Sequence, residues 1–268
     1  MSEGNDLKQQ FGIASRIWEI AYPVCMYYAA IIIGITIAQF VFGAGNESYM
    51  LCKTIGSIVA IFVVYADYKR DLMFSGRYGV KPQFSLEKCI NLLAVVGIMI
   101  GVSVALNNLI SMSPLPKLSE GYQEATDALY GSNIWWELLG SALITPILEE
   151  LLHRGVVYGR LRRRMSIWPA VFVSTLIFAT LHFNMVQFTY TFLLGIVLAL
   201  FVEKTGRLYP AIIAHMAANG IAVIRTETGF LAGTVDGSAF SWGVSVVLLV
   251  VGVIGLLLFS KNIFIKKS

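Results

Sequence analysis

The chain alternates between long apolar stretches and short polar segments along most of its length. An α-helix needs roughly 20 mostly apolar residues to cross the hydrocarbon core of a bilayer, and several stretches have this length. No internal repeat, low-complexity tract or Pro-rich linker divides the chain, so we expect one membrane-embedded domain over residues 1–268. The pattern predicts eight membrane-spanning helices, at about 17–43, 49–66, 90–111, 134–153, 167–184, 186–203, 208–225 and 239–260.

The composition agrees with lipid as the main solvent. Hydrophobic residues make up 57% of the chain and charged residues only 13%, whereas a soluble domain has roughly 45–50% and about 25%. These values exclude a disordered chain, a coiled coil and a nucleic-acid-binding module, and they disfavour an ordinary cytosolic enzyme. The predicted fold class is therefore all-α, a polytopic membrane helix bundle with the lipid bilayer as its partner.

The positions of Lys and Arg predict the orientation, because cytoplasmic loops are enriched in both. With the N-terminus inside, the inner segments hold sixteen of the 20 basic residues, and the outer side receives Lys53, Lys117 and Arg225. This distribution favours N-in and C-in with an even number of spans. The cluster from Arg160 to Arg164 could bind anionic lipid headgroups, but a plain topology signal is the better interpretation. The inner residues are Lys8, Arg16, Lys69, Arg70, Arg77, Lys81, Lys88, Arg160, Arg162, Arg163, Arg164, Lys204, Arg207, Lys261, Lys266 and Lys267.

Ionisable residues inside spans are the candidate functional groups, since each costs at least ~2.5–3.5 kcal/mol at the centre of a membrane helix. Glu149, Glu150 and Arg154 lie together in the fourth predicted span. The chain has three histidines, and all of them lie in or beside a span: His153, His182 and His215.

Helical geometry separates the two carboxylates. Glu150 and Arg154 are four residues apart, so they share a helix face and can pair. Glu149 is rotated by about 100° from Glu150, so one carboxylate can be anchored by Arg154 while the other faces a cavity. Pro146, just before them, should kink the helix or begin a new segment. On the seventh span, His215 and Asn219 are likewise four apart and share a stripe.

Each of these residues also has a purely structural interpretation. Glu150 with Arg154 could be a buried ion pair and no more, and a single His182 or His215 could simply hydrogen-bond between helices. Taken together, two histidines, an unpaired carboxylate and an amide exceed what packing requires. By contrast, His153 is predicted to be structural near the inner interface, and Glu137 to be solvated near the outer end of its span.

Three motifs resemble a known family of intramembrane endopeptidases. Residues 149–154 fit EExxxR, residues 178–182 fit FxxxH and residues 215–219 fit HxxxN. In this order, on successive apolar helices, they resemble the CAAX-protease and bacteriocin-processing family, also called Abi. The resemblance covers a protease core at about 134–225. His153 departs from the pattern, because family members usually carry an aromatic residue before the Arg.

The resemblance implies a role for each motif residue. Glu149 would be the general base that takes a proton from the attacking water, helped by His182. His215 and Asn219 would donate hydrogen bonds to the oxyanion of the tetrahedral intermediate. Glu150 and Arg154 would hold the helix and Glu149 in place. A membrane-associated peptide or protein would be the substrate: a prenylated CAAX tail, a bacteriocin leader or a signalling-peptide precursor all fit.

Two questions stay open at this point. Glu149, His182 and His215 could instead hold a zinc ion, although HExxH is absent and metal-free, glutamate-activated water is favoured. Non-proteolytic bacteriocin immunity, a membrane scaffold or a proton-coupled transporter are the competing functions, and no inverted repeat of the transporter kind is visible. The expected location is a bacterial plasma membrane.

One geometric difficulty follows from this assignment. At 1.5 Å per residue from Trp135, Glu149 would lie about 21 Å deep, whereas His182 would lie near the outer surface. The two can meet only if the fourth helix breaks at Pro146 or if the fifth and sixth helices form a shallow re-entrant hairpin.

Overall fold

The computed structural model describes residues 2–76 and 85–261, and the side chains from Ile13 onward with few exceptions. The described residues form helices of several kinds and no strand. In chain order these are α1 (Ser2–Phe42), α2 (Asn46–Phe74), α3 (Leu86–Met112), α4 (Leu115–Leu118), α5 (Tyr122–Tyr130), α6 (Ile134–Glu137), the π-helix η1 (Leu138–Ile144), α7 (Thr145–Glu150), the π-helix η2 (Leu151–Tyr158), α8 (Gly159–Arg162), α9 (Ile167–Thr180), α10 (Met185–Thr205), α11 (Tyr209–Thr228), the 3-10 turn η3 (Ala232–Thr234) and α12 (Ala239–Ser260).

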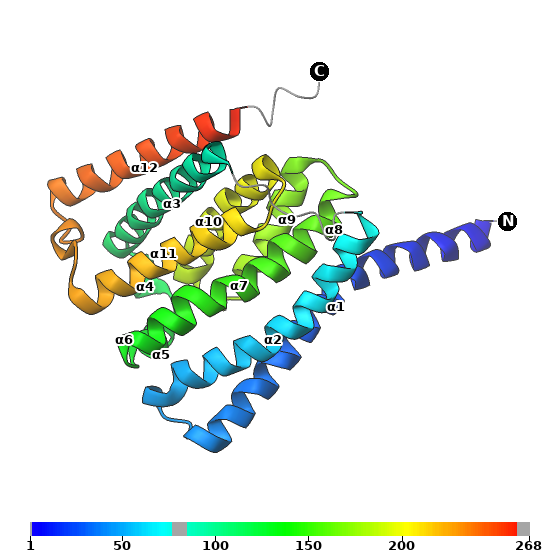
Figure 1. The fold of residues 1–268 in the computed structure, drawn as a ribbon, viewed down its shortest axis with the longest axis horizontal. Coiled ribbons are helices and arrows are strands. Elements are labelled where there is room, and N and C mark those ends of the chain that lie inside the picture. Colours follow the sequence, from blue (N-terminus) through cyan, green and yellow to red (C-terminus); the bar gives the residue numbers. More distant parts are fainter. Residues whose placement is uncertain (1, 77–84, 262–268) are drawn as a thin grey trace.

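The long helices form one bundle around a central rod (Figure 1). This rod is residues 134–162, which run without a break through α6, η1, α7, η2 and α8. It contacts α2 on one side and α11 on the other, while α1 packs along α2 and α3 along α12. The rod that carries EExxxR is therefore surrounded by other helices.

The structure confirms the all-α membrane bundle, and each predicted span coincides with a helical rod. Five described helices are long and apolar enough to cross a bilayer: Gly12–Phe42, Asn46–Phe74, Cys89–Met112, Met185–Thr205 and Ala239–Ser260. The other three rods, 134–162, Ile167–Thr180 and Tyr209–Thr228, are shorter or interrupted by polar residues. These three carry the motifs, so the count of eight spans stays a prediction.

The outside of the bundle is apolar, as lipid requires. Large hydrophobic side chains such as Phe40, Phe62, Leu93 and Leu258 are more than half exposed. On α12, exposed valines and leucines continue along most of the helix. A water-soluble protein rarely exposes so large an apolar surface, whereas helices in lipid satisfy their backbone internally and turn such side chains outward.

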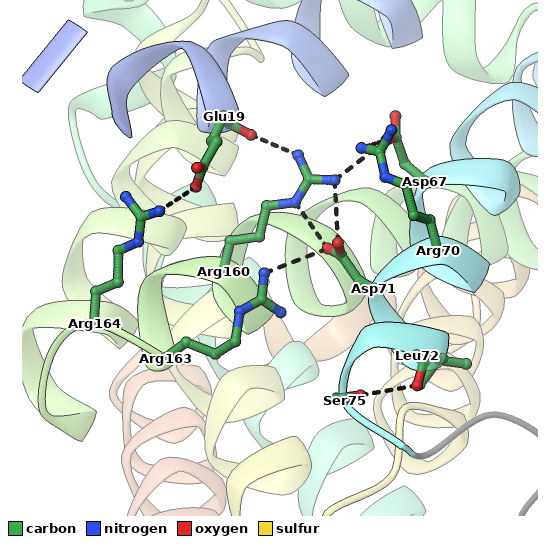
Figure 2. A network of polar contacts seen from close by, with 9 residues as sticks. All are labelled: Glu19, Asp67, Arg70, Asp71, Leu72, Ser75, Arg160, Arg163 and Arg164. Carbon is green, nitrogen blue, oxygen red and sulfur yellow. Dashed lines mark hydrogen bonds and ion pairs between the residues drawn. The ribbon is translucent and has the colours of Figure 1, made fainter. Parts of the chain in front are cut away.

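An ion-pair network holds the end of the bundle nearest both termini (Figures 1 and 2). At its centre Arg160, 5% exposed, donates from Nε to Asp71 Oδ2 at 2.8 Å and from Nη1 to the carbonyl of Glu19 at 2.6 Å. Its Nη2 pairs with Asp67 at 3.2 Å, and Arg164 pairs with Glu19. The basic cluster therefore ties α8 to α1 and α2, a structural role beyond a topology signal.

Some residues of the orientation argument lie outside the described part. Arg77, Lys81, Lys266 and Lys267 are among them, and the side chains of Lys8 and Lys88 are not described. Both ends of the described chain lie toward the same end of the bundle (Figure 1), as an even number of crossings requires. The N-in orientation itself stays a prediction.

We expect Arg160→Met to destabilise the bundle by about 3–5 kcal/mol, because Asp67 and Asp71 lose their buried cation and keep only the more exposed Arg70 and Arg163. Arg163→Met is the matched control. Arg163 is half-exposed and its ion pair with Asp71 is long, at 3.8 Å, so removal of this guanidinium should cost about 0–1 kcal/mol of stability. Thermal unfolding of the two purified variants in detergent measures the difference. Equal midpoints would contradict the central role of Arg160.

Candidate active site

The central rod changes helix type on both sides of α7, and Pro146 explains the first change. Proline has no N–H, and the N–H of Thr145 bonds to the carbonyl of Gly140, five residues back. This leaves the carbonyl of Ser141 free, and Asn219 Nδ2 of α11 donates to it at 2.9 Å. The helix therefore does not break at Pro146, as one option required, but switches from π to α geometry. π-turns of this kind are frequent at functional sites.

Glu150 is the centre of a buried polar cluster. It is fully buried, and its Oε1 lies 3.0 Å from Nη1 of Arg154 and 2.9 Å from Nδ1 of His215. Arg154, also buried, donates from Nη2 to the carbonyl of Gly195 at 3.1 Å. The cluster thus joins the central rod to α10 and α11.

Glu149 turns to the other side, into a cavity of about 420 Å³. Its side chain keeps 14% exposure, and its Oε2 lies 3.6 Å from Nε2 of His215. His182 and Asn219 line the same cavity. The structure therefore separates the two carboxylates as their positions on the helix predict, one paired with Arg154 and one facing the cavity.

His182 lies in the turn after α9, and its Nδ1 is 3.0 Å from the carbonyl of Phe178. The 14 residues of α9 measure about 21 Å at 1.5 Å per residue, less than the ~30 Å of a hydrocarbon core. The turn can therefore lie below the membrane surface, as the option of a shallow hairpin requires. Direct or water-bridged contact between His182 and Glu149 stays a prediction.

The ring of Phe178 packs against all three histidines. Its ring centroid lies 5.0 Å from that of His182, 6.1 Å from that of His215 and 4.7 Å from that of His153. The guanidinium carbon of Arg154 lies 4.5 Å from the same centroid, within cation–π range. The FxxxH motif thus supplies both a histidine and the surface on which the site is packed.

Of two expectations about polar residues of the central rod, the one for Glu137 was wrong and the one for His153 stays a prediction. His153 is 2% exposed and lines the cavity, because it is four residues from Glu149 and shares a helix face with it. Glu137 is not solvated: it is fully buried and accepts a hydrogen bond from the N–H of Ser132. The helix spacing to Glu149 could have revealed the position of His153, whereas no local pattern signals the burial of Glu137.

The sequence analysis missed two further residues at the site. Lys53, placed on the outer side, lies within α2 and lines the cavity. A lysine inside an apolar span was the available signal. Gly195 has no polar side chain to mark it, but its carbonyl accepts from Arg154.

The alternative zinc site is not supported by the side-chain arrangement. Within residues 2–76 and 85–261, no three His, Cys, Asp or Glu side chains are grouped so as to hold a metal ion. The contact of His215 Nδ1 with Glu150 does not bear on this question, because Nε2 remains available as a ligand. The metal alternative is left to a chelator experiment.

Comparison with known families points to the same part of the chain. Residues 131–221 match the family model of type II CAAX prenyl endopeptidases, Rce1-like. The match covers about a third of the chain, and we refer to residues 131–221 as the Rce1-like region. The matched residues contain all three motifs and the whole rod from α6 to α8, so the resemblance deduced from the motifs is confirmed.

Two curated bacterial proteins are similar to part of the chain. A Bacillus subtilis (strain 168) protein named for a membrane peptidase, YdiL, is 28% identical over 87 residues, 32% of this chain and 36% of that protein. The membrane-embedded CAAX protease MroQ of Staphylococcus aureus (strain USA300) is 36% identical over 89 residues, 31% of this chain and 36% of that protein. The chain thus matches about a third of the length of each relative. No solved structure matches it.

We expect Gly195→Ala to disturb the candidate active site. A Cβ at this position would lie 2.6 Å from Cγ2 of Thr175 and 2.9 Å from Nη2 of Arg154, and such overpacking costs about 1–3 kcal/mol. Gly220→Ala is the control, because its Cβ would meet only Cβ of Ala142 at 3.9 Å. A thermal midpoint of Gly195→Ala equal to that of the control would refute the tight contact at Arg154.

Proposed function

We propose that the protein is an intramembrane endopeptidase of the CAAX-protease type, which hydrolyses a peptide bond by glutamate-activated water. The observation that carries the proposal is the separation of the adjacent carboxylates. Glu150 is occupied by Arg154 and His215, while Glu149 faces a cavity inside a lipid-facing bundle. A carboxylate beside two imidazoles and an amide is a donor and acceptor set suited to acyl hydrolysis.

In the proposed reaction Glu149 removes a proton from a water molecule in the cavity. The oxygen of this water attacks the carbonyl carbon of the peptide bond. The negative charge then develops on the carbonyl oxygen. As the C–N bond breaks, the proton passes to the leaving amine, which gives one carboxylate product and one amine product. His182 assists the proton transfers from its place on Phe178, and no covalent enzyme intermediate is formed.

The contacts of His215 and Asn219 set conditions on their oxyanion roles. When Glu150 accepts from Nδ1 of His215, Nε2 can donate to an oxyanion only if the ring is protonated on both nitrogens. The amide of Asn219 has two N–H groups, and one of them is used by Ser141. The second N–H of Asn219 can donate to the oxyanion whether His215 is protonated on one nitrogen or on both. The donation from Asn219 therefore does not depend on the protonation state of His215.

A membrane-associated peptide or protein would be the substrate, reached from within the bilayer, and a bacterial cell membrane would be the location. The apolar exterior and the organisms of the two relatives support this. Prenylated tails, bacteriocin leaders and signalling-peptide precursors all contain segments that such a cavity could hold. Non-proteolytic immunity or scaffolding is the competing function on the same fold.

Glu149→Gln keeps size and polarity but removes the base, so we expect cleavage to fall by about 10²- to 10⁴-fold. Comparative peptidomics of cells that carry the wild type or this variant should reveal a membrane-associated peptide that is no longer trimmed. Glu124→Gln, an exposed change on α5, is the control. Unchanged peptide patterns with normal insertion would favour immunity or scaffolding instead.

Full activity after treatment with a strong chelator is the expected outcome for the purified protein, since in the proposed reaction Glu149, helped by His182, activates the water without a metal ion. The assay is cleavage of the peptide found by peptidomics, before and after dialysis against the chelator. Activity that disappears and returns with added zinc would establish the alternative site of Glu149, His182 and His215.

A further inference from the structure

The cavity contains one lysine that the proposed reaction does not use. Among the described residues that line it, Lys53 and Glu149 are the only Lys, Arg, Asp or Glu side chains. Lys53 belongs to α2, outside residues 131–221 that match the family model. No hydrogen bond or close ion pair engages its ammonium group in the described part of the chain, although the charge of Glu149 acts on it.

Tight packing of α2 against the central rod explains how Lys53 reaches the cavity. A Cβ on Gly140 would lie only 2.2 Å from Oγ1 of Thr54, the residue after Lys53. Tyr49, one turn before Lys53, also lines the cavity. The face of α2 that bears Lys53 is therefore held against the same space as Glu149.

Among the described residues around Glu149, no cation other than Lys53 is available to balance its charge. Arg154 is engaged with Glu150, and His215 donates to Glu150 through Nδ1 when that nitrogen carries the proton. The other titratable groups that face Glu149 are His153 on its own rod, His182 after α9, and Tyr27 and Tyr28 on α1. None of these has a fixed positive charge, and an uncompensated carboxylate in a low-dielectric site is costly.

We propose that Lys53 is the counter-charge of Glu149, a positioning residue that acts through this carboxylate and allows it to work as a base. With Lys53 present, two cations balance two carboxylates, and His215 is free to gain and lose a proton during the reaction. Without Lys53, a proton on Glu149 or His215 would have to supply the balance. This inference rests on the proposed endopeptidase function.

The test is the pH dependence of kcat/KM for Lys53→Met, Lys53→Arg and wild type. The probe is a quenched fluorescent peptide with the sequence that wild-type protein trims and Glu149→Gln does not. Removal of a positive charge makes protonation of Glu149 easier. The acid limb of the profile, where kcat/KM falls at low pH, should therefore lie about one pH unit higher in Lys53→Met than in wild type. At pH values on this limb kcat/KM of Lys53→Met should be up to about tenfold lower than that of wild type, and at higher pH it should recover. Lys53→Arg should retain the wild-type limb.

Lys117→Met removes the same charge from an exposed position on α4, and its profile should match that of wild type. An unmoved acid limb in Lys53→Met, a loss equal at every pH, or a change confined to KM would overturn the proposal. If Lys53→Met does not fold, Lys53→Gln replaces it, with thermal midpoints measured for all variants. If no peptide is found that wild type trims and Glu149→Gln does not, the endopeptidase mechanism itself is refuted, whereas an unmoved acid limb of Lys53→Met on such a peptide refutes only the role of Lys53.

Discussion

The buried carboxylate of Glu150 is the contact on which the arrangement of the site depends. It receives Arg154 from its own rod and His215 from α11, and Arg154 continues to the carbonyl of Gly195 on α10. In a bilayer no water is present to solvate an ion whose partner is lost, so breaking one pair leaves a charge uncompensated. This penalty keeps three helices in register. Because Glu150 makes these contacts, the preceding residue, Glu149, is not needed to hold the three helices together.

The change of helix type around Pro146 performs a related task for the backbone. Because Pro146 has no N–H, one carbonyl of this segment has no backbone donor. In the π-turn this is the carbonyl of Ser141, and Asn219 donates a hydrogen bond to it. Asn219 is therefore fixed at the cavity wall by the cost of an unpaired backbone group. The HxxxN motif acquires a structural reason as well as a chemical one, because its two residues contact the central rod at separate points.

The residues outside the Rce1-like region, 131–221, also contribute to the candidate site. α2 supplies Lys53 to the cavity, and α1 supplies Tyr27 and Tyr28. At the other end of these helices Arg160 binds Asp67, Asp71 and the backbone of Glu19 (Figure 2), which fastens α1 and α2 to the central rod. A domain limited to the matched residues would therefore lack one wall of its cavity and the anchor that positions this wall.

The sequence by itself determined the membrane environment, the approximate rods and the motif residues, because hydropathy and helical spacing are local properties that act over one or two turns. The different directions of Glu149 and Glu150 followed from the same spacing. Only the tertiary structure decided that His215 bridges the two carboxylates, that His153 and Lys53 line the cavity, and that Glu137 is buried. These outcomes depend on which helices approach one another and at what depth, and packing across residues distant in the chain sets both.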